Sequence, residues 1–185
     1  MQATEQQSEP AKDNEFKFAQ GVEMENCGFS FHPLVGFELE IDGSIYMYAD
    51  TGSVEVFMVG GQLTENDSIA DLNDELAAEF MEHVGEYELI PAGTDKIQDI
   101  TGFLNDIQFS NPEEEGSGYA LICSPYVNQY FFILMIASAE YWEEKGKILY
   151  EALKAKINFH PQFTPEILQD TRNKYPDLTT ETHEA

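Results

Sequence analysis

The 185-residue chain is long enough for one domain with a substantial core, and its charge is strongly one-sided. It has 35 Asp or Glu residues against 9 Lys or Arg, which gives a formal net charge of -26. Such a surface repels phosphate backbones and anionic membranes, which argues against nucleic-acid binding and attachment to acidic lipids. Hydrophobic residues make up 42% of the chain, which excludes disorder throughout.

The few basic residues are unevenly placed along the chain. Lys96 is the only one between Lys17 and Lys145. Four explanations of the acidic surface stay open: a basic protein partner, divalent cations, a saline habitat or simple solubility. The longest apolar run, 130–137, is too short to cross a bilayer, so no direct membrane insertion of the given chain is expected.

Composition along the chain predicts one domain between two tails. Residues 1–15 are polar and are expected to form a disordered tail, 16–160 to form a single domain, and 161–185 a C-terminal tail. A cytoplasmic location and an exported or lipid-anchored position in a bacterial envelope, with the signal removed, both agree with this organisation.

The first part of the domain predicts strands. Residues 15–25 are typical of a short hairpin, and alternation of apolar and polar residues over 29–42 predicts half-buried strands. Residues 44–61 predict two apolar-rich strands joined at Asp50-Thr51-Gly52, because a three-residue loop with glycine is a common hairpin connection.

Apolar residues at helical spacing predict the first main helix, over about 68–84. Ser68 and Asp71 resemble a capping box, and Gly85 suits the C-cap. The apolar stripe consists of Ile69, Leu72, Leu76, Phe80 and Val84. This pattern indicates a helix that packs one face on the sheet.

Four further strands and a second helix complete the domain. The predicted strands are 87–91 with an extension to about 97, 101–110, 118–124 and 130–137, the last apolar on both faces. Ser138 caps the second main helix, over about 139–157, which buries Trp142, Leu149, Leu153 and Ile157. The predicted fold is α+β: an α/β/α sandwich with a central antiparallel sheet and two main helices.

The order of these elements and three local patterns resemble the PsbP-like superfamily. The patterns are FSFHPLVGFELEID at 29–42, NQYFFILMIASAEYW at 128–142 and LYEALKAKINF at 149–159. They are similar to that family's opening strands, its penultimate strand with a Trp near the start of the final helix, and its closing helix. The resemblance implies a compact α/β/α sandwich, found in photosystem II extrinsic subunits, a Ran-binding import factor and bacterial lipoproteins. Its members act by binding proteins and share no known catalytic site.

The tetrapeptide DTGS at 50–53 carries the catalytic aspartate in pepsin-like and retroviral-type proteases. That chemistry needs a second carboxylate that shares the proton, from a second motif or from a homodimer. The chain contains no second copy. The sequence therefore assigns Asp50 to a tight turn and leaves a dimeric aspartyl hydrolase using Asp50 as an alternative.

A stripe of Asp, Glu and His on the first helix is an arrangement suited to a metal ion. Asp71, Glu75, Glu79 and His83 repeat every four residues and would share a face that could ligate a divalent cation. A solvated helix face explains the acids equally well, and the H-E-x-x-H order is missing. The sequence thus assigns no catalytic, cofactor-binding or metal-binding residue. These four residues stay candidates for metal ligands, and a divalent-cation-binding module stays an alternative function.

The leading hypothesis from the sequence is a non-enzymatic binding or accessory protein. It would engage a basic protein partner through its acidic surface, as a monomer or weak oligomer. Cys27 and Cys123 are expected to be buried thiols, or a disulfide if the compartment is oxidising.

Overall fold

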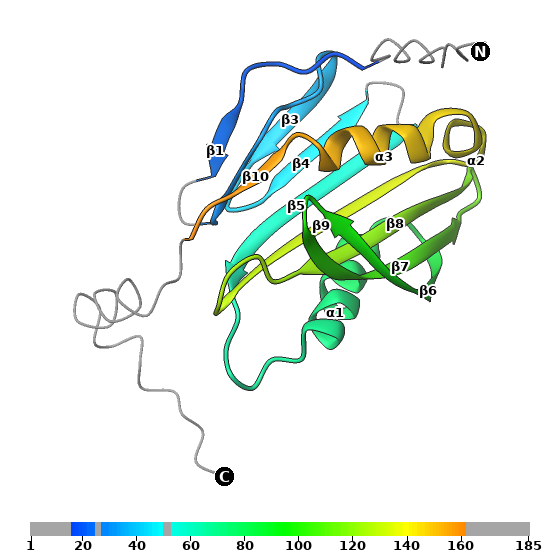
Figure 1. The fold of residues 1–185 in the computed structure, drawn as a ribbon. Coiled ribbons are helices and arrows are strands. Elements are labelled where there is room, and N and C mark those ends of the chain that lie inside the picture. The colour runs from blue at the N-terminus through cyan, green and yellow to red at the C-terminus, as the bar shows by residue number, and fades with distance from the viewer. Residues whose placement is uncertain (1–15, 25–26, 50–52, 162–185) are drawn as a thin grey trace, which may run out of the picture.

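The computed structural model describes residues 16–24, 27–49 and 53–161, so Asp50 and the two expected tails, apart from Pro161, lie outside the described residues. The described chain forms a large antiparallel sheet with helices on both faces (Figure 1). Its strand order is β3-β4-β5-β9-β8-β7-β6. These strands are β3 (Phe37–Ile41), β4 (Ile45–Ala49), β5 (Val54–Gln62), β6 (Glu86–Ile97), β7 (Ile100–Ser110), β8 (Glu115–Cys123) and β9 (Gln129–Ser138). The predicted α+β sandwich is confirmed.

Strand β9 lies at the centre of the sheet and is covered on both faces. Two consecutive residues of this strand, Phe131 and Phe132, point to opposite sides of the sheet, and both side chains are at most 1% exposed. Phe131 joins the core beneath the second helix, whereas Phe132 joins the core beneath the first. The prediction from its unbroken apolar run is confirmed, because a strand covered on both faces needs apolar residues at both parities.

The first helix, α1 (Ile69–Met81), lies over β7, β8 and β9. Ser68 Oγ accepts a hydrogen bond from the backbone N–H of Asp71 at 3.4 Å, as the capping pattern predicts. The fully buried positions, however, are Asn73, Ala77 and Met81, not the predicted apolar stripe, which is only partly buried. Phe80 of this stripe packs on Phe57 of β5 and on Tyr46 of β4.

The second helical segment follows β9 directly. It consists of α2 (Ala139–Tyr141), one π-helical turn η1 (Trp142–Gly146) and α3 (Lys147–Lys154). The four residues predicted to be buried, including Trp142, are buried. Gly146 is required here, because a Cβ at this position would lie 2.5 Å from Cε3 of Trp142. Among the described residues, no helix is long and apolar enough to span a bilayer.

A three-stranded sheet packs beside α3 on the same core. It consists of β1 (Val22–Met24), β2 (Phe29–Phe31) and β10 (Ile157–Phe159), in the order β1-β2-β10. Ile157 therefore pairs with Phe31 and does not end the helix. The hairpin predicted over 15–25 is wrong, since β1 pairs with β2 and Phe18 bridges to Leu34.

Close backbone contact joins the small sheet to the large one. A Cβ on Gly60 of β5 would lie 2.1 Å from the carbonyl oxygen of Cys27, so only glycine allows this approach. Beside it, Gln129 Nε2 donates to the carbonyl oxygens of Gly28 and His160, each at 3.1 Å.

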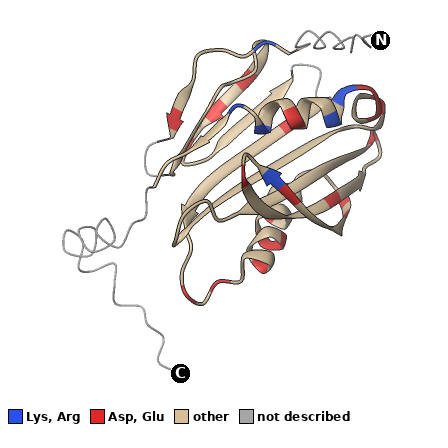
Figure 2. Ribbon diagram, in the orientation of Figure 1, with Lys and Arg blue, Asp and Glu red and all other residues tan. Residues whose placement is uncertain are grey.

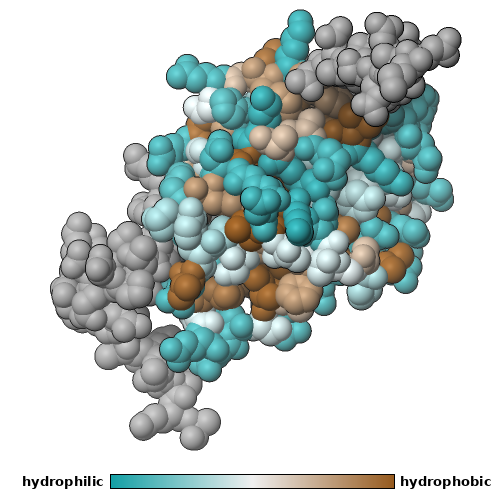
Figure 3. All heavy atoms as spheres, in the orientation of Figure 1, coloured by the Kyte–Doolittle hydropathy of each residue, from teal (hydrophilic) through white to brown (hydrophobic). Residues whose placement is uncertain are grey.

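Over the view in Figure 3, the surface is largely hydrophilic, with apolar side chains in separate patches.

Candidate functional site

The outer face of β3, β4 and β5 combines carboxylates with aromatic rings. Glu38 pairs with Tyr48, and Glu40 pairs with Tyr46, across the β3–β4 ladder. Cross-strand partners share a face of the sheet, so each ring lies beside a carboxylate. The same ladder continues into β5, where Tyr48 pairs with Glu55 and Tyr46 with Phe57. We call this surface the acidic–aromatic face; it consists of Glu38, Glu40, Tyr46, Tyr48, Glu55 and Phe57.

Positive charge lies elsewhere in the described part of the chain. The six described cations are Lys17, Lys96, Lys145, Lys147, Lys154 and Lys156. Figure 2 shows them mainly on and around the helical segment α2–α3, while α1 and β3 carry only acidic charges. The charge asymmetry seen along the sequence is therefore also an asymmetry in space.

An open groove separates α1 from the acidic–aromatic face. It has a volume of about 420 Å³ and is lined by Ser44, Tyr46, Phe57, Leu76, Glu79, Phe80 and His83. Phe80 stacks on Phe57, with 5.1 Å between ring centroids and an interplanar angle of 26°. Its centroid is also 5.9 Å from that of Tyr46 and 5.0 Å from that of His83. The partly buried stripe of α1 thus forms one wall of this groove.

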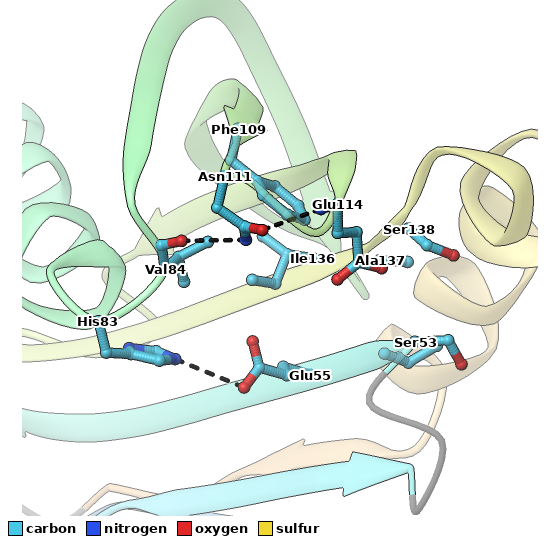
Figure 4. Close-up of a pocket in the computed structure, with 11 residues that line it drawn as sticks. Ser53, Glu55, His83, Val84, Phe109, Asn111, Glu114, Ile136, Ala137 and Ser138 are labelled. Atoms are coloured by element: carbon cyan, nitrogen blue, oxygen red, sulfur yellow. Dashed lines mark hydrogen bonds and ion pairs between the residues drawn. The ribbon is translucent and has the colours of Figure 1, made fainter.

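A smaller pocket of about 210 Å³ adjoins the groove at His83. Figure 4 shows Glu55 from β5 and Glu114 from the β7–β8 turn pointing toward this pocket from opposite sides. His83 Nε2 lies 3.4 Å from Glu55 Oε1, and the same oxygen accepts a hydrogen bond from the hydroxyl of Tyr46. Asn111 holds the turn, since its Oδ1 accepts from the N–H of Glu114 at 2.9 Å.

The ionised form of Glu114 is disfavoured in this pocket. Partial burial raises the pKa of Glu114 above its ordinary value, and the nearby charges of Glu55 and Glu113 raise it further. Burial raises the pKa of Tyr46 as well, and its hydrogen bond to Glu55 adds to the effect. A raised carboxyl pKa means that the ionised form of Glu114 is disfavoured in the folded protein, first by burial and then by the neighbouring carboxylates, so that protonation lowers this cost.

The structure separates the four metal candidates predicted from the sequence. Glu79 and His83 line the groove, but Asp71 and Glu75 do not. His83 lies beyond the end of α1, and its Nε2 is near Oε1 of Glu55. Within residues 16–24, 27–49 and 53–161, no group of three or more His, Cys, Asp or Glu side chains could hold a metal ion. Divalent-cation binding by the stripe stays a prediction from the sequence.

Sequence reasoning singled out Glu79 and His83 but missed the strand residues of the groove. Tyr46 and Tyr48 alternate with the buried Ile45 and Met47, so two large aromatic rings stand on the strand face opposite the core. Aromatic residues at solvent-facing strand positions were the available signal, because a strand with one solvated face normally carries polar residues there.

A scan against models of protein families finds no match, and no curated protein matches by sequence. Solved structures do match over most of the chain, each with a TM-score of 0.52. Cyanobacterial PsbP (CyanoP) from Synechocystis is 8% identical, with 76% of this chain and 92% of that chain covered. The Ran-binding protein Mog1p from Saccharomyces cerevisiae is 10% identical, with 78% and 96% covered.

LpqN from Mycobacterium tuberculosis, described as involved in cell envelope biogenesis, is 11% identical, with 80% of this chain and 94% of that chain covered. At such identities the comparisons concern the arrangement of strands and helices and carry no site residue across. The chain has the fold of the PsbP-like proteins, and the resemblance noted in the sequence is confirmed at that level.

Proposed function

We propose that this protein is a non-enzymatic binding or accessory protein that engages a basic protein partner through the acidic–aromatic face. The observation that carries the proposal is the separation of charge: Glu38, Glu40 and Glu55 surround the rings of this face, while the described lysines gather mainly around α2–α3. Complementary charge of this kind accelerates association and selects basic partners.

Two further observations support a binding role. Aromatic rings are enriched at protein interfaces, because they bury a large area with few rotatable bonds, and four of them surround the groove or its rim. One structural neighbour is a Ran-binding protein, so the fold is compatible with protein recognition. Since one fold hosts many functions, the charged face carries the proposal and the neighbour only supports it.

Neutralising exposed carboxylates of this face and of the adjoining groove tests the proposal. The triple variant Glu38→Gln, Glu40→Gln and Glu79→Gln keeps side-chain size and removes three charges from exposed positions. We expect its affinity for a fluorescein-labelled nona-lysine peptide to fall by about tenfold at low ionic strength, because each exposed charge pair contributes roughly 0.5 kcal/mol. Fluorescence anisotropy measures the dissociation constant.

A matched variant controls for net charge. Glu86, Glu88 and Glu115 are exposed glutamates that line a shallow hollow beside Ala139 at the start of α2. Their triple replacement by glutamine changes the net charge by the same amount, and we expect it to weaken binding by less than about twofold, through screened long-range attraction alone. Equal losses in the two triple variants would contradict the proposed face.

A further inference from the structure

The groove beside α1 differs from an ordinary acidic surface because its floor and wall are aromatic. The Phe80 ring contacts those of Phe57 and Tyr46, at centroid distances of 5.1 and 5.9 Å, and all three rings are only partly buried. The volume of the groove, about 420 Å³, falls within the range of roughly 300–1,000 Å³ that is usual for ligand pockets. The groove therefore combines partly exposed aromatic rings with space for a side chain.

Carboxylates lie beside these rings. Glu79 is part of the groove lining, and Glu40 lies beside Tyr46 on the neighbouring strand. Glu55 is tied to the groove by its hydrogen bond from the Tyr46 hydroxyl, and both of its contacts, to Tyr46 and to His83, use Oε1. Neither the groove nor the adjoining pocket is lined by a described Lys or Arg.

Aromatic rings beside carboxylates match one side chain better than others. The arginine guanidinium is planar, stacks on aromatic rings and donates paired hydrogen bonds to carboxylates, whereas the lysine ammonium is a strongly hydrated point charge. A purely apolar segment would leave Glu79 desolvated without a partner, which is unfavourable. A phosphate group would be repelled by the same carboxylates.

We propose that this groove binds an arginine side chain presented by the basic partner protein, with the guanidinium stacked on Phe80 and Tyr46 and hydrogen-bonded to Glu79 and Glu55. The inference rests on the proposed function and names the chemistry that the acidic–aromatic face recognises. The pocket next to the groove, with Glu55 and Glu114 on opposite sides, lies where a second basic side chain of the same segment would be accommodated.

The test compares nona-arginine with nona-lysine peptides of equal charge. We expect the wild-type protein to bind nona-arginine roughly fivefold more tightly, on the scale of one cation–π contact. Phe80→Leu removes the ring and keeps an apolar side chain, so the ratio of the two dissociation constants should fall to about one, while nona-lysine affinity stays unchanged. Phe80→Tyr restores a ring face and should restore the preference for arginine.

Phe103→Leu is the matched control. Phe103 is 45% exposed and contacts the opposite flank of α1, where its carbonyl oxygen accepts from Asn73 Nδ2 at 3.4 Å. This variant should keep the arginine preference. Tyr46→Leu provides a second groove variant, should Phe80→Leu fold poorly, and thermal melts establish that each variant is folded.

The outcomes separate this inference from the proposed function. If both peptides bind equally in the wild type, or the preference survives Phe80→Leu and Tyr46→Leu, the groove inference is overturned, although a charge-dependent acidic face could still stand. If neither peptide binds, the proposed function itself fails. If the groove variants lose the preference for arginine and the Phe103→Leu variant keeps it, both the groove inference and the proposed function are supported.

Discussion

Replacement of Phe132 by alanine is expected to lower the free energy of unfolding by about 3–5 kcal/mol, the range found when a buried aromatic ring is deleted from a core. Phe132 is 0% exposed at the centre of the sheet, in the core that α1 covers. Its ring lies 6.2 Å from that of Phe57, in an edge-to-face arrangement, so it also supports the floor of the groove. Urea denaturation measures the loss.

Phe131→Ala is the matched comparison, because the two residues are adjacent and face opposite cores. Phe131 packs edge-to-face on Phe29 and Phe159, with centroid distances of 4.8 and 5.1 Å. We expect a similar loss of stability, of about 3–5 kcal/mol. Only the milder Phe132→Leu, and not Phe131→Leu, should reduce the preference for nona-arginine. A loss below about 1 kcal/mol for Phe132→Ala would contradict the packing described for this face.

Asp95→Ala is expected to destabilise the protein by about 2–3 kcal/mol, because it leaves a buried ammonium group with one fewer carboxylate. The Lys154 side chain is 6% exposed, and its Nζ lies 2.6 Å from Asp95 Oδ2, 2.9 Å from Glu151 Oε1 and 3.3 Å from the carbonyl oxygen of Lys96. This ammonium group ties α3 to the end of β6. Glu151 still neutralises it in the variant, which keeps the loss below that of an unpaired buried charge.

Lys154→Met supplies the contrasting half of this prediction. Methionine fills the space of the lysine stem, and Asp95, whose side chain is 30% exposed, can then be hydrated by solvent. We expect a loss of less than about 1.5 kcal/mol, since replacing a buried ion pair member by an apolar group of similar size is tolerated best when the remaining charge reaches water. A larger loss for Lys154→Met than for Asp95→Ala in thermal and urea unfolding would contradict this reasoning.

Elements with a strong local period were predictable from the sequence. The buried face of α3, with Leu149 and Leu153, follows from a period of 3.6 residues, and β9 follows from an unbroken apolar run of strand length. Strand β10 was not predictable in this way. Ile157 lies four residues after Leu153, so it fits the helical period, and only its long-range pairing with Phe31 makes it a strand residue.

The groove could not be predicted, because periodicity shows that a helix has an apolar face without showing what covers that face. Leu76 and Phe80 belong to the predicted stripe of α1. The strands β3 to β5 form the part of the sheet beside the helix, so these two side chains line an open groove. Likewise, the approach of Glu55 to Tyr46 depends on the register of β4 and β5. The acidic character of the surface was evident from composition, whereas its separation from the lysines required the fold.

Amide chemical-shift mapping of the wild-type protein with the nona-lysine peptide tests the placement of the binding face most directly, because it needs no substitution. The predicted result is that shifts at low peptide excess gather on β3, β4, β5 and the C-terminal turn of α1, around Glu38, Glu40, Tyr46 and His83. Shifts gathered around Glu86, Glu88 and Glu115, or spread evenly over every acidic residue, would contradict a dedicated acidic–aromatic face.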